Sequence, residues 1–117
     1  MYKIPENFDV SEIINQVIFQ IAFGLNFVSL FFDKGFIQFS GSFSFKSVVG
    51  FISYLEVYPI KDDLGLLRLL QKKITNIHIN NDRNELRIEF EDKSELCLIG
   101  NRYESFLIHI NGTEIRV

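Results

Sequence analysis

Residues 36–45, FIQFSGSFSF, alternate between apolar and polar side chains, and this pattern constrains the fold more than any other feature of the sequence. Side chains of a β-strand point to opposite faces in turn, so a period of two predicts a strand with one buried face. Gly41 lies on the apolar face and predicts a bulge or the close approach of another backbone. The apolar positions are Ile37, Phe39, Phe43 and Phe45.

Further strands are predicted along most of the chain. Asp33-Lys34-Gly35 and Asn111-Gly112 indicate hairpin turns, because glycine accepts positive φ. Residues 46–60 fit either another strand or a segment that crosses the core, and Pro59 ends any regular element there. The predicted strands cover residues 17–23, 28–32, 36–45, 74–79, 86–90, 96–98, 106–110 and 113–117.

Two segments are predicted to be helical. Asp9 or Ser11 can cap a short helix over about residues 10–15. A longer helix is expected from Asp62 to about Lys73, because its lysines at the end suit the helix dipole and its leucines form a broad apolar stripe. Those leucines are Leu64, Leu66, Leu67, Leu69 and Leu70.

The two halves of the sequence resemble each other. Residues 18–23 match residues 74–79, and the Val28-x-Leu30-x-Phe32 pattern returns at residues 86–90 after a turn that is two residues longer. Generic β patterning also produces such matches, so an internal duplication is a hypothesis. We expect a single domain over residues 1–117 of the α+β, β-rich class. It would comprise two helix-plus-antiparallel-meander halves, at about 10–45 and 62–100, packed around one core, and a C-terminal hairpin over 105–117.

Charge and cysteine content exclude several function classes. A net charge of −3 argues against a nucleic-acid-binding protein, which normally carries a basic stripe. The single cysteine, Cys97, allows no intramolecular disulfide and favours a reducing compartment, so we expect a cytoplasmic protein. Residues 13–32 are uncharged and long enough to span a bilayer, but Asn15, Gln16 and Gln20 would need partners in hydrocarbon. We therefore expect no membrane segment.

No catalytic or metal-binding motif can be assembled from the sequence. His78 and His109 stand alone in predicted strands, without the spacing of a zinc site. Cys97 lies between two leucines, with no basic neighbour to activate it. We expect neither an enzyme nor a bound cofactor or metal.

Two surfaces are candidates for binding. The first is acidic and would dock on a basic protein surface. A row of acidic side chains on one strand face is, however, often only a solvated face. The second is apolar: Phe27, Phe31 and Phe36 need cover, either from the predicted helix at 62–73 or from a second chain in a homo-oligomer. The acidic candidates are Asp62, Asp63, Glu85, Glu89, Glu91 and Asp92.

A family resemblance extends from about residue 13 to residue 117. The patterns QVIFQIxFG at residues 16–24, VxLxFDKG at residues 28–35 and LLxxxIxxI at residues 69–77 resemble a family of small bacterial domains of unknown function. This family includes immunity proteins of polymorphic toxin and contact-dependent growth inhibition systems. The resemblance implies a cytoplasmic protein that neutralises a cognate toxin, often a nuclease, by blocking its active site or substrate surface. The alternative from the residues is a homo-oligomeric structural or small-ligand-binding domain.

Overall fold

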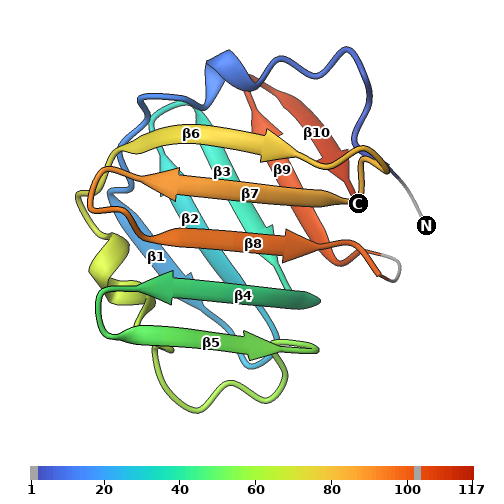
Figure 1. The fold of residues 1–117 in the computed structure, drawn as a ribbon. Helices are drawn as coiled ribbons and strands as arrows, with labels where there is room; N and C mark the ends of the chain where they lie inside the picture. The colour runs from blue at the N-terminus through green and yellow to red at the C-terminus, as the bar shows by residue number, and fades with distance from the viewer. Residues whose placement is uncertain (1–2, 102–103) are drawn as a thin grey trace.

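The computed structural model describes residues 3–101 and 104–117, which fold into two five-stranded antiparallel sheets (Figure 1). Besides ten strands, this part of the chain has two short 3-10 helices, η1 (Val10–Glu12) and η2 (Leu66–Leu69). The predicted α+β class with helix-plus-meander halves is therefore wrong. The domain is a β-sandwich.

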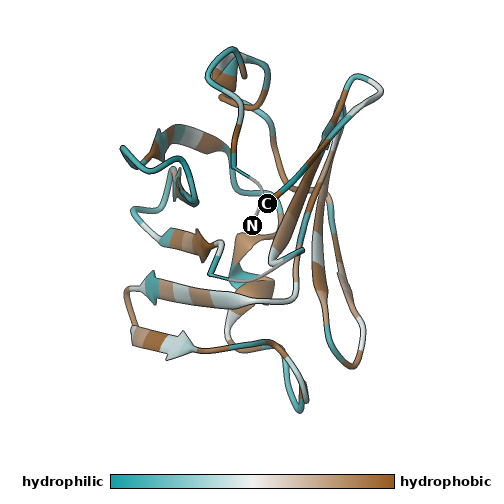
Figure 2. Cartoon of the chain, turned by 90° about the vertical axis from the view of Figure 1, so that its right-hand side faces the viewer, coloured by the Kyte–Doolittle hydropathy of each residue, from teal (hydrophilic) through white to brown (hydrophobic). Residues whose placement is uncertain are grey.

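The two sheets form two layers whose strands cross at a steep angle (Figures 1 and 2). In order across the first sheet, the strands are β1 (Gln20–Phe23), β2 (Val28–Phe32), β3 (Gly35–Phe39), β9 (Phe106–Ile110) and β10 (Thr113–Arg116). In order across the second sheet, they are β5 (Gly50–Tyr54), β4 (Ser42–Ser47), β8 (Glu95–Ile99), β7 (Glu85–Phe90) and β6 (Ile74–Ile79). Residues 46–60 thus contain a strand, β5, followed by a connection.

The core lies between the sheets and consists of alternate residues from each strand. The alternation predicted for β2 and β7 is confirmed, since every second side chain of both strands is buried. Each fully buried phenylalanine contributes about 2 kcal/mol of transfer free energy. The largest fully buried side chains are Phe39, Phe43, Phe90 and Phe106.

The segment FIQFSGSFSF is two strands in different sheets, whereas the sequence predicted a single strand. The N–H groups of Ser40 and Gly41 both donate to the carbonyl oxygen of Ser105, at 3.0 and 3.0 Å. A Cβ on Gly41 would lie 2.7 Å from the Cβ of Ser105, which close packing does not tolerate. The close backbone approach predicted at Gly41 is confirmed, and it occurs where the chain crosses between the sheets.

The helix predicted from Asp62 to Lys73 is wrong, and only η2 occupies that segment. Leu64, Gly65 and Gln71 have φ values of 56°, 77° and 66°, which a right-handed helix cannot include. Two leucines of η2 are fully buried in the core, so one short turn is sufficient to bury them. The first predicted helix is likewise only η1, and Asp9 caps it by accepting the Ser11 N–H at 3.0 Å, as predicted.

The two halves of the chain follow the same course. In each half a 3-10 helix leads into a three-stranded meander, β1-β2-β3 or β6-β7-β8, and then into a hairpin, β4-β5 or β9-β10. Each hairpin leaves its own meander and pairs with the meander of the other half. The halves also meet at an isolated antiparallel bridge between Val17 and Lys73. A common origin of the halves remains a prediction.

Reciprocal hydrogen bonds flank that bridge. The Asn15 N–H donates to the carbonyl oxygen of Ile74 at 2.7 Å, and the Gln71 N–H donates to the carbonyl oxygen of Ile18 at 2.7 Å. Both donor residues have left-handed backbone, with φ values of 75° and 66°. Asn15 corresponds to Gln71, and Ile18 corresponds to Ile74, when one half of the sequence is aligned with the other. The two bonds are therefore equivalent, and the junction has a local two-fold arrangement.

Candidate functional site

The six acidic residues predicted to dock on a partner come from three parts of the fold. Asp62 and Asp63 lie in the connection before η2, Glu85 and Glu89 lie on β7, and Glu91 and Asp92 lie in the turn between β7 and β8. Three of the six accept hydrogen bonds from backbone N–H groups.

Asp62, Glu91 and Asp92 each accept a backbone N–H. Asp62 Oδ1 accepts the Leu64 N–H at 2.8 Å, and Glu91 Oε1 accepts the N–H of the residue before β6 at 3.1 Å. Asp92 Oδ1 accepts both the N–H and the hydroxyl of the buried Ser94, at 3.0 and 2.6 Å. These carboxylates fix turns, which is a structural task that the sequence pattern did not reveal.

The outer face of the second sheet mixes both signs of charge. Glu85 and Glu89 lie on it, as predicted for one strand face, but basic residues lie beside the acids. His78 Nε2 lies 3.2 Å from Glu89 Oε1, and Arg87 Nε lies 3.9 Å from Glu95 Oε1. Neighbouring charges of opposite sign cancel at a distance, so this face produces a weaker negative field than the acids alone would.

The two histidines lie on opposite outer faces of the sandwich. His109, in the first sheet, stacks on Phe36 with 5.1 Å between ring centroids, and its Nδ1 lies 4.0 Å from Glu114 Oε1. His78 lies in the second sheet. The two rings therefore cannot act together on one substrate. Across the described residues, no three His, Cys, Asp or Glu side chains gather closely enough to hold a metal ion.

Cys97 lies on β8, paired with Ser44 on one side and Arg87 on the other. Burial raises the pKa of the Cys97 thiol and Glu85 raises it further, while Arg87 opposes the shift. A raised pKa keeps the sulfur protonated at neutral pH, and the protonated form is a poor nucleophile. The arrangement gives no support to thiol catalysis.

Exposed large apolar side chains occur on and beside the edge strands β1 and β5 and on η2, and we call this part of the surface the apolar side. Figure 1 shows that the edge strands β1 and β5 and the helix η2 all lie toward this side. A hydrogen bond of 2.9 Å from the Ile60 N–H to the carbonyl oxygen of Leu25 joins the connection after β5 to the turn after β1. Among the described residues, the exposed large apolar side chains are Val17, Phe19, Phe23, Leu25, Val48, Val49, Phe51, Tyr54, Leu55, Tyr58 and Leu67.

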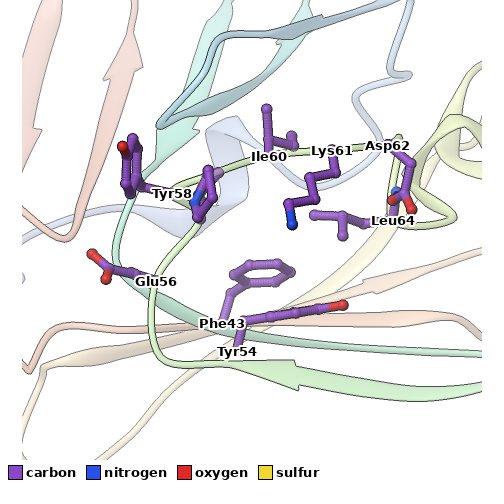
Figure 3. A pocket seen from close by; sticks show the side chains of 10 residues that line it. Phe43, Tyr54, Glu56, Tyr58, Ile60, Lys61, Asp62 and Leu64 are labelled. Atoms are coloured by element: carbon purple, nitrogen blue, oxygen red, sulfur yellow. The ribbon is translucent and has the colours of Figure 1, made fainter.

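A cavity of about 320 Å³ opens on the apolar side, between β5 and the connection that follows it (Figure 3). Phe43 forms its floor, and Tyr54 lies against that ring with 5.5 Å between centroids. Tyr58 and Ile60 line it from the connection after β5, and the Lys61 side chain points toward Phe43 (Figure 3). A surface that is both apolar and hollowed is typical of a binding site.

The phenylalanines predicted as a second binding surface are only partly exposed. Phe31 and Phe36 pair across β2 and β3 with 5.4 Å between ring centroids, and Phe27 packs against Gly24. Only the short 3-10 helix η2 forms within residues 62–73, so the predicted cover of these rings by a helix from Asp62 to Lys73 is wrong. The apolar side was not predicted, because its residues belong to β1, β5 and neighbouring segments that are far apart in the sequence. Their exposure depends on both strands lying at sheet edges.

In comparisons with known proteins, no family model, curated protein or solved structure matches the chain. In the described part of the chain, no helix has the length and apolar character needed to cross a membrane.

Proposed function

We propose that this chain is a non-catalytic protein-binding domain whose partner covers the apolar side. The observation that carries the proposal is the exposure of large apolar side chains on and beside the edge strands β1 and β5, next to the cavity that Tyr54 and Tyr58 line. Monomeric proteins rarely leave such patches uncovered, and aromatic residues are enriched at the centres of protein interfaces. The mixed-charge outer face of the second sheet offers less to a partner.

The partner we propose is a toxin domain, so that the chain is a cytoplasmic immunity protein. The support is the family resemblance of residues 13–117, together with a net charge of −3, which suits a basic partner such as a nuclease. In this proposal Phe19, Leu25 and Tyr58 dock on the toxin near its active site or substrate surface. Glu85 and Glu89 act at most at the rim, where charges influence the rate of association more than the affinity.

The test uses the protein encoded beside this chain, which the proposal expects to contain a toxin domain. Co-expression should protect cells from that domain, and the two purified proteins should form a complex. Phe19→Ser with Leu25→Ser should weaken the complex by at least 100-fold, on the scale of interface hot spots. Glu85→Gln with Glu89→Gln is the matched control and should change affinity by less than about tenfold. If the neighbouring domain neither harms cells nor binds this chain, the toxin proposal is wrong.

A further inference from the structure

We infer that two copies of this chain pair through β5, joining their second sheets into one continuous ten-stranded sheet. β5 is the last strand of its sheet, and in the described structure its only ladder is with β4. A strand at a sheet edge presents unpaired N–H and C=O groups that can pair with another strand. β5 belongs to the apolar side, but its backbone edge is separate from Phe19, Leu25 and Tyr58, the residues proposed to dock on the toxin.

β5 lacks the features by which proteins usually protect an edge. No charged residue and no proline occur from Ser47 to Leu55. The edge strand β10 carries Glu114 and Arg116, and β6 has a register shift between Ile74 and Asn76. Charges and bulges both discourage strand addition, so β10 and β6 are protected where β5 is open.

The remaining edge strand, β1, is also uncharged but is closed at both ends by the chain itself. Gln71 donates its N–H to the carbonyl oxygen of Ile18, just before β1, and Ile60 donates to that of Leu25, just after it. Only four residues lie in the strand between these contacts. β5 has five residues, and the hydrogen bonds just after it, from Ser42 Oγ to the carbonyl oxygen of Leu55 and from the Val57 N–H to that of Ser40, run toward β4 and not toward its outer edge, so β5 is the edge that can accept another strand.

The sequence of β5 favours a second copy of this chain as the strand that pairs with its free edge. In an antiparallel pair centred on Ile52, Gly50 faces Tyr54 of the other copy and Phe51 faces Ser53. Each pair then combines a large side chain with a small one, and an aromatic ring can cover the glycine opposite it. Ile52 meets its own counterpart at the centre. This register uses all five residues of the strand.

Charge favours the same occupant. Phe51 is 64% exposed, and the flanking Val49 and Leu55 are 68% and 84% exposed. A second copy brings an equally uncharged, apolar strand, whereas a charged strand would lose hydration without gaining an ion pair. Since the seam is short, we expect a weak dimer, with a dissociation constant of about 1–100 µM.

Sedimentation equilibrium of the full chain tests the interface and its register. The wild type should show a monomer–dimer equilibrium. Phe51→Lys with Ser53→Lys places lysines opposite each other and should weaken dimerisation at least tenfold, since like charges directly opposite are destabilising. Phe51→Lys with Ser53→Glu makes each lysine face a glutamate and should recover most of the lost affinity. All changed side chains are exposed in the monomer, so circular dichroism and thermal unfolding should match the wild type.

Glu114→Lys on β10 is the matched control and should leave the equilibrium unchanged. A wild type that stays monomeric at about 1 mM, the weak limit of specific association, overturns the proposal. A dimer that the lysine pair does not weaken, or that the Lys/Glu pair does not recover, overturns the β5 register. Toxin binding by the Phe51→Lys, Ser53→Lys protein is measured in a separate experiment. The result for dimerisation is then distinct from the result for the proposed function.

Discussion

Ile18 and Ile74 make the same backbone hydrogen bond in opposite directions across the junction of the two halves. The Ile18 N–H donates to the carbonyl oxygen of Lys72 at 3.0 Å, and the Ile74 N–H donates to that of Gln16 at 2.8 Å. Both isoleucines are fully buried. The two residues therefore hold equivalent places in the core, and each half depends on the other for its first strand.

This equivalence predicts matched losses of stability. Ile18→Ala and Ile74→Ala should each lower the free energy of unfolding by about 2–5 kcal/mol, through lost transfer energy and the cavity that remains. Urea denaturation measures both. Val17→Ala, at a 44% exposed position beside the junction, is the control and should cost less than about 1 kcal/mol. If one isoleucine proves dispensable, the two positions are not equivalent.

Gly41 should tolerate no side chain where the chain crosses between the sheets. Gly41→Ala should destabilise the domain by about 1–3 kcal/mol, because the added methyl group meets Ser105. Ser105→Gly removes the side-chain atoms that cause most of the clash, so Gly41→Ala should cost less in that background. A double-mutant cycle measures the coupling. Equal costs in the two backgrounds would show that the close approach is not the cause.

Asp92 should contribute to stability rather than to partner binding. Asp92→Ala removes the acceptor of two hydrogen bonds from the buried Ser94 and should cost about 1–3 kcal/mol. Glu85→Ala, on the mixed-charge face, should change stability by less than about 0.5 kcal/mol. Thermal unfolding distinguishes the two variants. Equal stability of both proteins would contradict the structural task assigned to Asp92.

The thiol of Cys97 should titrate at high pH. Burial raises its pKa above the ordinary value of 9.0, so the folded state holds the proton after the unfolded chain releases it. The resulting stabilisation is complete below pH 9.0 and is lost as the pH rises through the folded pKa. Iodoacetamide labelling should therefore show an inflection above pH 9.0, against one near that value in urea.

Two variants test the direction in which each neighbouring charge shifts the pKa of the Cys97 thiol. Glu85→Gln should move the labelling inflection of Cys97 to lower pH, because Glu85 raises the pKa of the thiol. Arg87→Gln should move the inflection to higher pH, because Arg87 lowers the pKa. An inflection at or below pH 9.0 in the folded wild type would contradict burial as the main cause.

Period-two patterns predicted the strands well because burial of one sheet face is a local property of the sequence. The break at Gly41 was harder to place. The inward positions of β3 and β4, such as Phe39 and Phe43, keep the same period across it although they lie in different sheets. Only the glycine on the apolar face marked the crossing, and the close approach it predicted is the one that Ser105 makes.

The helix over residues 62–73 could not be excluded from local sequence. Its leucine stripe fits a helix, but Leu64 and Gln71 have left-handed backbone, and Gln71 is tied to a distant part of the chain. Gln71, for example, donates its N–H across the junction to Ile18. The binding surface had the same difficulty. Acidic residues are visible in sequence, whereas an apolar side composed of two edge strands appears only when the sheet order is known.

The central claim is that the apolar side binds a toxin, and a titration of the protein encoded beside this chain, where we expect a toxin domain, tests it most directly. Calorimetry should show a one-to-one complex between subunits. It should also show a loss of at least 100-fold in affinity for the Phe19→Ser, Leu25→Ser variant, against less than about tenfold for Glu85→Gln, Glu89→Gln. Wild-type affinity in the first variant, with the loss in the second instead, would contradict the account and assign binding to the outer face of the second sheet.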